Sequence, residues 1–571
     1  MNISKYTKRL IACCTLWFTC TSLHAVPHVT GLAAKMRSGQ VILTWDEDST
    51  VEGITYQVFA SPHPITPEKL ENAYKVGQHI EAGSACDWWQ NPASFQADAP
   101  SDRSHGFIID GIELDPASGL FVHTVTPKDP DEMYFAVLPS NASATHIQMG
   151  ANSLATPIKT HVAPPQPIQL KAAPASGSAS GKSLTLVLHG LGGGRDPHNT
   201  SNFLLFGDAR QGWRQGLARK FTVTSNSEGI IIEPRDWMWI GRPLLHSKDP
   251  RDHALAINTW WYGCNDRIYD AKEALNGVVV NYTEEHLLYL VRWAQKEYGT
   301  DPNKTHIKGL SMGGSGAISM GFHHPETFAT IFSSVPIVAY TKRAGIDGKS
   351  NLPLLNALCG RTCDETVMTN EGISIIERMN SERIAREHIG DLPFLVFSNG
   401  RNDRPIPWIN NPPFYHALNE AKRGFVSYWN NGGHDMWKSV PDDVTNYYTS
   451  QPIQLNKSYP AFSNNSTNRK PGNGSRKDGD ATGWINRGLY WSDVIETADR
   501  WQISLHARGD FLPSKLTLDL TPRNLQKFKI MPNEILLVNG QQQQASSTGT
   551  LTVNGVTIHK GAPTHLHIQR L

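Results

Sequence analysis

The chain lacks an excess of charge of either sign. It has 53 Lys and Arg residues against 52 Asp and Glu residues, which gives a formal net charge of +1. A general role in binding nucleic acids or anionic membrane surfaces requires a basic surplus. The composition therefore argues against a nucleic-acid partner, although a local charged patch remains compatible with a balanced total.

Cysteine is scarce, and three of the seven cysteines lie within the first 20 residues. The other four are Cys86, Cys264, Cys359 and Cys363. An even number permits disulfides in an oxidising compartment, and Cys359 and Cys363 are close enough in sequence to close a small loop. Since no C-x-x-C pair or histidine cluster has the spacing of a zinc site, we expect no metal and no other cofactor.

Long hydrophobic runs are missing as well. Residues 1–25 have the pattern of a secretory signal peptide, because basic residues precede an apolar run of about 11 residues from Leu10 and Ala25 offers a small side chain for cleavage. The run is shorter than the roughly 20 residues that cross a bilayer. We expect a secreted or periplasmic protein whose mature chain has no membrane span. An N-terminal membrane anchor is the alternative.

Composition and periodicity divide the remaining chain into three folded units joined by two linkers. Short alternating strands with turn residues between them fill residues 26–162, which predicts a β-sandwich. Residues 163–182 are rich in Pro, Ala and Ser and predict a linker. Strands alternate with helices across residues 183–450. After a polar linker at 451–483, short strands return in residues 484–571 and predict a small C-terminal β domain.

The N-terminal unit resembles a fibronectin type III module. The residues that carry the resemblance are Thr30-Gly31-Leu32, Trp45 on the second strand, Tyr56 on the third and Tyr134 near the start of a later one. The resemblance implies the sandwich architecture of that family. The stretch 76–107 is longer than the family usually carries.

The central unit has the pattern of a doubly wound, mostly parallel sheet of the α/β class. Continuous apolar runs are typical of strands that are buried on both faces. Residues 284–298 predict a helix with Thr283 as its N-cap and Gly299 as its C-terminal stop. The apolar runs are Leu184–Leu188, Ile230–Glu233, Thr330–Ser334 and Pro393–Phe397.

Two segments of the C-terminal part carry weaker signals. Asp478-Gly479-Asp480 offers carboxylates for a calcium loop, but no acidic ligand follows at the required spacing, which favours a solvated turn. The glutamines at 541–544 predict a loop.

The segment Gly309-Leu310-Ser311-Met312-Gly313 matches G-x-S-x-G, the pattern of a nucleophile elbow. Residues 305–308 can form a strand directly before it, and residues 314–320 can form a helix directly after it. The glycines beside Ser311 remove side chains that would clash in such a strand-to-helix turn. Ser311 is therefore the predicted nucleophile. An ordinary glycine-rich turn is the alternative.

A serine nucleophile needs a base and an acid, which follow it along the chain in folds of this order. His434 comes after the predicted strand 425–429 and has small neighbours in Gly432 and Gly433. Asp403 comes just beyond the carboxyl end of the strand 393–397, where loops carry catalytic groups. We predict His434 as the base and Asp403 as the acid that holds its tautomer.

Acyl transfer also needs donors for the developing oxyanion. The predicted donors are the backbone N–H groups of Met312, next after the nucleophile, and of Leu191, in a tight turn after the first core strand. The glycines at 192–194 fit neither the phosphate loop nor the dinucleotide pattern, which argues against phosphate binding there.

Together these motifs resemble the putative-esterase branch of the α/β hydrolases, which includes esterase D-like, feruloyl-esterase-like and polyester-depolymerase-like enzymes. The resemblance covers about residues 183–440 and implies the α/β-hydrolase fold. It also implies a triad of Ser311, His434 and Asp403, with Leu191 and Met312 as oxyanion donors. The segments that carry it are Leu186–Gly190, Asp301–Asn303, Gly309–Gly314 and His324–Phe328.

A tryptophan-rich insert at residues 235–269 departs from that family. Trp260 and Trp261 lie in it, together with Trp237 and Trp239, and Trp408 follows Asp403. Rigid aromatic faces beside a nucleophile suit sugar rings or phenolic acyl groups, so we predict Trp260, Trp261 and Trp408 as substrate contacts. Packing of a long insert is the alternative.

The sequence thus predicts a secreted serine hydrolase that cleaves carboxylic esters through an acyl-enzyme. We predict that the substrate is an acetyl or feruloyl ester on a polysaccharide, or a polyester. A serine peptidase of prolyl-oligopeptidase type shares the triad order, but the N-terminal region is too small for its propeller. A non-catalytic extracellular binding or adhesion protein with a hydrolase-like core is the other alternative.

Overall fold

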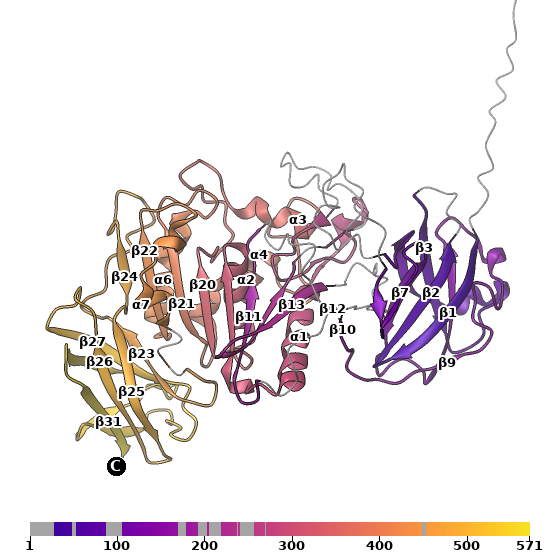
Figure 1. Cartoon of the computed structure of the whole chain (residues 1–571). Helices are drawn as coiled ribbons and strands as arrows, with labels where there is room; N and C mark the ends of the chain where they lie inside the picture. Colours follow the sequence, from indigo (N-terminus) through magenta and orange to yellow (C-terminus); the bar gives the residue numbers. More distant parts are fainter. Residues whose placement is uncertain are drawn as a thin grey trace, which may run out of the picture.

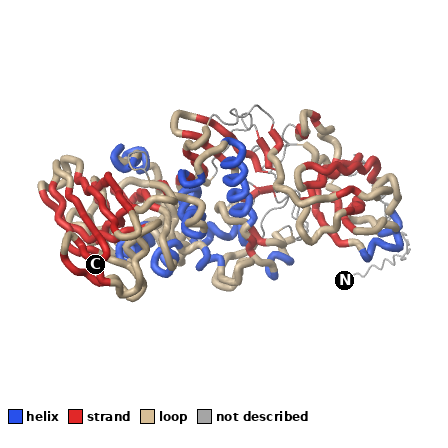
Figure 2. Tube along the Cα trace, turned by 90° about the horizontal axis from the view of Figure 1, so that it is seen from below, coloured by secondary structure: helices blue, strands red, loops and turns tan. Residues whose placement is uncertain are grey.

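The computed structural model describes residues 28–47, 53–86, 106–169, 179–191, 202–204, 219–236, 238–239, 256–268, 270–447, 451 and 453–571. Three units follow one another in a row, from the N-terminal strands in indigo to the C-terminal strands in yellow (Figure 1). Most of the helical turns lie in the middle unit (Figure 2). The predicted signal peptide, residues 1–25, and Trp237 lie outside the described residues.

Two antiparallel sheets of the N-terminal unit share one core. Trp45 and Tyr56 come from different sheets, are fully buried, and meet edge to face with ring centroids 5.6 Å apart. A side chain at Gly119 would clash with the Trp45 ring, which explains the glycine there. The fibronectin type III resemblance stays a prediction. The sheets are β1 (Val29–Arg37), β2 (Gln40–Glu47) and β7 (Gly119–Thr124), and β4 (Tyr74–Glu81), β3 (Thr55–Ser61), β8 (Glu132–Pro139) and β9 (Ile158–Lys159).

In the part of the chain that the structure describes, ten strands form the mixed sheet of the central unit. Six neighbouring strands in its middle are parallel, and the strand on each side of this block pairs with it in antiparallel fashion. The predicted parallel sheet is therefore present, with antiparallel edges added. In spatial order the strands are β10 (Ile168–Gln169), β12 (Asn202–Leu204), β13 (Arg219–Ser225), β14 (Gly229–Pro234), β11 (Ser183–Leu188), β19 (Thr305–Leu310), β20 (Thr330–Ser334), β21 (Phe394–Gly400), β22 (Phe425–Asn430) and β24 (Gly483–Ile485).

Helices and short hairpins surround this sheet. Those that the structure describes are α1 (Tyr282–Tyr298), α2 (Met312–His323), α3 (Asn356–Cys359), α4 (Ile375–Arg378), α5 (Ser381–Glu387), α6 (Asn411–Glu420) and α7 (Asp442–Thr445). Two-stranded pairs of this unit are β15 (Met238–Trp239) with β16 (Ala256–Ile257), and β17 (Cys264–Asn265) with β18 (Val279–Val280). A further pair, β5 (Ile108–Ile109) with β6 (Ile112–Glu113), belongs to the N-terminal unit. Among the described helices, none combines the length and the apolar character needed to span a membrane. All four described cysteines are buried.

Helix α1 starts two residues earlier than the sequence predicted. Its N-cap is Asn281, and the predicted cap Thr283 lies inside the first turn. The Thr283 hydroxyl is buried and lies 2.5 Å from the Thr259 hydroxyl, so tertiary contact takes it away from a capping role. Gly299 ends the helix as predicted, because its φ of 65° is a left-handed conformation that glycine tolerates.

A buried ion cluster joins α1, α4 and the end of α2. Arg378 donates to Glu284 at 2.7 Å and to Glu371 at 2.9 Å, while the His324 ring lies 3.2 Å from Glu284. Glu284 and Arg378 are almost completely buried. Burial alone would raise the pKa of Glu284, but His324 and the charge of Arg378 outweigh it and lower that pKa to about 2.

Arg378→Met is expected to lower the free energy of unfolding of the central unit by about 3–5 kcal/mol at pH 7, because it leaves the Glu284 carboxylate buried without its main partner. The double variant Arg378→Met/Glu284→Gln should recover part of that loss. The matched control is Arg383→Met, which removes an exposed ion pair with Glu387 and should cost less than about 1 kcal/mol. Urea unfolding followed by tryptophan fluorescence measures all three, and equal losses in Arg378→Met and Arg383→Met would contradict the prediction.

The same cluster gives the wild-type protein an acid-sensitive contribution to stability. The pKa of Glu284 is lower in the folded chain than the ordinary 4.5, so its contribution is complete above about pH 4.5 and is lost as pH falls toward 2.

The C-terminal unit contains two antiparallel sheets, one of which includes a strand from the predicted linker 451–483. That strand is β23, and β24, which follows it, joins the central sheet beside β22. The predicted loop Gln541–Gln544 is wrong, because these residues form β29, paired with β28 through the turn Asn539-Gly540. Both turn residues have positive φ, as a two-residue hairpin requires. The sheets are β23 (Tyr459–Ser463), β27 (Lys515–Arg523) and β30 (Val553–His559), and β25 (Leu489–Glu496), β26 (Arg500–Ala507), β31 (Thr564–Arg570), β28 (Ile535–Val538) and β29 (Gln541–Gln544).

Candidate active site

Ser311 occupies a sharp turn between β19 and α2. Its φ of 58° and ψ of −119° lie in a region that residues with a β-carbon rarely adopt. The Ser311 N–H donates to the Ser334 carbonyl at 2.8 Å, which ties the turn to the next strand. Such strain persists only where the surroundings enforce it, and it gathers at functional sites. The conformation is that of the predicted nucleophile elbow.

The glycines of the motif are required by backbone contacts. A β-carbon at Gly309 would lie 2.0 Å from the Gly313 carbonyl oxygen, and one at Gly313 would lie 2.0 Å from the Leu188 carbonyl oxygen. Both positions therefore exclude any side chain. The close packing of β11, β19 and α2 that results holds Ser311 in place.

His434 and Asp403 form a directly bonded pair. The His434 Nδ1–H donates to Asp403 Oδ2 at 2.8 Å, which leaves Nε2 of the ring as an acceptor. Asp403 is 1% exposed, and its other oxygen accepts the Ile406 N–H at 3.2 Å. His434 is 40% exposed, so its ring is accessible while the carboxylate behind it is not.

The three predicted residues stand at one edge of the sheet. Ser311 follows β19, Asp403 follows β21 and His434 follows β22, and these strands are parallel. The carboxyl ends of parallel strands meet at the same edge. Among the described residues, Ser311 Oγ has no hydrogen-bond partner. Bonds between a nucleophile and its base are commonly long before substrate binds.

The predicted oxyanion donors belong to two segments that adjoin Ser311. Met312 is the first residue of α2, and N–H groups of a first helical turn have no acceptor within the helix. Gly190 packs on the nucleophile, since a β-carbon there would lie 3.4 Å from Ser311 Cβ. Leu191 comes directly after this contact, and its side chain is exposed.

Sequence reasoning missed the group that supports the Leu191 turn. Asp236 is fully buried, and its carboxylate accepts the N–H groups of Thr259 at 3.0 Å and Trp261 at 3.1 Å. Its own N–H donates to His189 Nε2 at 2.9 Å, and the Trp261 indole N–H donates to the His189 carbonyl at 3.2 Å. The carboxylate thus orders the tryptophan-rich insert internally, and the Asp236 N–H and the Trp261 indole N–H link that insert to His189, two residues before Leu191. No local pattern around Asp236 marks it, because its partners lie more than twenty residues away.

The predicted substrate contacts Trp260 and Trp261 have packing roles in the structure. They are 3% and 1% exposed. Trp261 lies against α2 at Gly316, where a β-carbon would meet its ring, and Trp260 meets Tyr340 edge to face at 5.5 Å. Both rings therefore match the alternative prediction, in which these tryptophans pack a long insert. Trp408 is also 1% exposed, although it borders an open groove beside Asp403.

A family model described as putative esterase matches residues 249–439 of this chain. The predicted resemblance to this branch of hydrolases is thereby confirmed for that segment. No curated protein matches the sequence.

Solved structures similar to this chain include several esterases. An S-formylglutathione hydrolase from Agrobacterium tumefaciens has 13% identity and a TM-score of 0.29, over 48% of this chain and 82% of its own. A ferulic acid esterase has 16% identity and a TM-score of 0.27, over 46% and 82%. An esterase from Thermogutta terrifontis has 14% identity and a TM-score of 0.24, over 48% and 80%.

Proposed function

We propose that the protein is a serine hydrolase that cleaves carboxylic esters through an acyl-enzyme, with Ser311 as nucleophile, His434 as base and Asp403 as the orienting acid. The observation that carries the proposal is the pairing of a strained, positive-φ serine at a helix N-terminus with a His434–Asp403 hydrogen bond at the same sheet edge. The match of residues 249–439 to an esterase family supports it.

In the proposed reaction, Ser311 Oγ attacks the carbonyl carbon of the ester and its proton passes to His434 Nε2. Asp403 stabilises the imidazolium through the Nδ1–H bond. The N–H groups of Met312 and Leu191 donate to the oxyanion that develops on the carbonyl oxygen. His434 then protonates the departing alcohol, and a water molecule repeats the sequence to release the acid and restore Ser311.

The proposal extends to location and substrate. The signal-like residues 1–25 support secretion or a periplasmic location. An acetyl or feruloyl ester on a polysaccharide, or a polyester, is the proposed substrate class. The two β units that flank the central sheet are consistent with a multidomain extracellular protein.

Labelling with a fluorophosphonate probe tests the nucleophile. We expect one adduct in the folded protein, located by fragmentation on Ser311 and not on Ser315 one turn later. The Ser311→Ala variant and heat-unfolded wild type should both remain unlabelled. Absence of labelling in folded wild type would favour the non-catalytic binding protein. Turnover of peptides but not of aryl esters by a labelled protein would favour the peptidase.

A further inference from the structure

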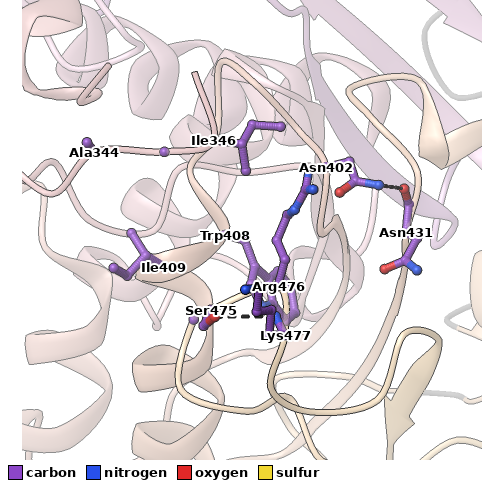
Figure 3. A pocket seen from close by; sticks show the side chains of 11 residues that line it. Ala344, Ile346, Asn402, Trp408, Ile409, Asn431, Ser475, Arg476 and Lys477 are labelled. Carbon is purple, nitrogen blue, oxygen red and sulfur yellow. Dashed lines mark hydrogen bonds between the residues drawn. The ribbon is translucent and has the colours of Figure 1, made fainter. Parts of the chain in front are cut away.

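An open groove of about 580 Å³ lies beside the proposed triad acid. Its walls come from loops that follow three neighbouring strands of the sheet and from a loop near the C-terminal unit (Figure 3). The lining residues that matter here are Ile346 after β20, Asn402 and Trp408 after β21, Asn431 after β22, and Arg476 and Lys477.

The groove is continuous with the loops that carry the triad. Asn402 directly precedes Asp403, and its N–H donates to the Gly432 carbonyl at 3.0 Å, two residues before His434. The Asn402 side chain also donates to the Asn431 carbonyl across the groove wall (Figure 3). A group that occupies this groove would therefore lie beside the loops that carry Asp403 and His434.

The loop that carries Arg476 and Lys477 is fixed in place by a buried arginine. Arg401 is 2% exposed and lies two residues before Asp403. Its guanidinium donates to the carbonyl oxygens of Arg476 at 3.0 Å and of Asp478 at 2.7 Å. Gly474 presses on Ile409, since a β-carbon there would lie 2.7 Å from Ile409 Cα. The two cationic residues are thus attached to the catalytic unit rather than to a free tail.

The charge in the groove is of one sign. Its lining residues include Arg476 and Lys477 but no Asp or Glu. Neither cation forms an ion pair with any residue that the structure describes. The nearby carboxylates are engaged with the loop's own backbone, because Asp478 accepts the Asn473 N–H at 2.9 Å and Asp480 accepts the Lys470 N–H at 2.7 Å.

We infer that this groove binds an anionic group of the substrate, so that the protein prefers esters that carry a carboxylate or sulfate over neutral esters of the same size. The inference rests on the proposed ester hydrolysis at Ser311. Arg476 and Lys477 would be specificity residues that attract the anion, and the apolar Ile346 and Trp408 would contact the carbon skeleton that bears it.

Two matched pairs of substrates test the inference. Mono(4-nitrophenyl) adipate and 4-nitrophenyl hexanoate differ by a carboxylate on the acyl part, and 4-acetoxybenzoate and its methyl ester differ by one on the alcohol part. For each pair, the preference is the kcat/KM of the anionic ester divided by that of the neutral ester. In at least one pair, this preference should be about fivefold lower in the double variant Arg476→Gln/Lys477→Gln than in wild type. The sulfonate analogue of each anionic ester tells a carboxylate site from a sulfate site.

Lys470→Gln is the matched control, because Lys470 belongs to the same loop but does not line the groove. It should keep the wild-type ratio. At 1 M NaCl, where the Debye length falls to about 3 Å, the wild-type preference should shrink toward that of the double variant.

Unchanged ratios in the double variant, or an equal fall in Lys470→Gln, would overturn the inference. Calorimetric titration of the same esters into Ser311→Ala measures affinity without turnover. Absence of turnover in wild type would therefore refute the proposed hydrolysis alone, whereas equal affinity for both members of both pairs would refute the anion site.

Discussion

Ser311→Ala is expected to lower kcat for 4-nitrophenyl acetate by about 10⁶-fold, with a residual rate from the oxyanion donors and substrate binding. The loss is this large because no acyl-enzyme can form without the hydroxyl, and the remaining groups do not act independently. Progress curves measure kcat for the variant and the wild type, and active-site titration gives the concentration of active wild-type enzyme. Activity within tenfold of wild type would exclude Ser311 as the nucleophile.

The Ser311→Gly variant provides a second readout, the melting temperature, which would not respond in this way if Ser311 were an ordinary surface serine. It removes the same hydroxyl, so its kcat should fall equally. Glycine adopts a φ of 58° without the cost that a β-carbon imposes there, so Ser311→Gly should unfold at a higher temperature than Ser311→Ala, by about 2–4 °C for about 1 kcal/mol. Equal melting temperatures would indicate that the turn is not strained.

The order of strands and helices in the central unit could be predicted because the sequence patterns that mark them are local. The apolar run 394–397 is buried on both faces, the run 184–188 alternates between buried and half-buried residues, and Ser311 sits between a strand and a helix where the glycine spacing put it. Chain order, a position just after a predicted strand and, for His434, small neighbours then selected His434 and Asp403 from many candidates, and the structure joins them by a hydrogen bond.

Most of the features that sequence reasoning missed depend on contacts between distant residues. Thr283 has the chemistry of a helix cap, but burial against Thr259 overrides that preference. Asp236 holds the segment before Leu191 through its N–H bond to the distant His189 ring. Local polarity also misled the assignment of Gln541–Gln544, where the Asn539-Gly540 turn was the better signal. The cationic groove belongs to the same class, because bonds from Arg401 hold a segment of the predicted linker at the edge of the central sheet.

Asp403→Asn is expected to lower kcat by about 10⁴-fold while leaving the fold intact, because the two side chains have the same shape. One oxygen of Asp403 accepts the Ile406 N–H, which would hold the amide oxygen of the variant on that side. The amide NH₂ would then face His434 Nδ1 and donate to it. That arrangement places the ring proton on Nε2, so the imidazole could no longer accept the proton of Ser311.

The neighbouring Asp435→Asn is the control for this change, since it removes an equal charge one residue from His434 but has no bond to the ring among the described contacts. Its kcat should stay within about tenfold of wild type, because charge alone contributes little at an exposed position. Pre-steady-state acylation by 4-nitrophenyl acetate distinguishes the two variants, as only Asp403→Asn should lose the burst. Equal effects of the two variants would mean that Asp403 acts only through its negative charge near the sheet edge. A large loss confined to Asp403→Asn would instead require the specific tautomer that its hydrogen bond imposes on His434.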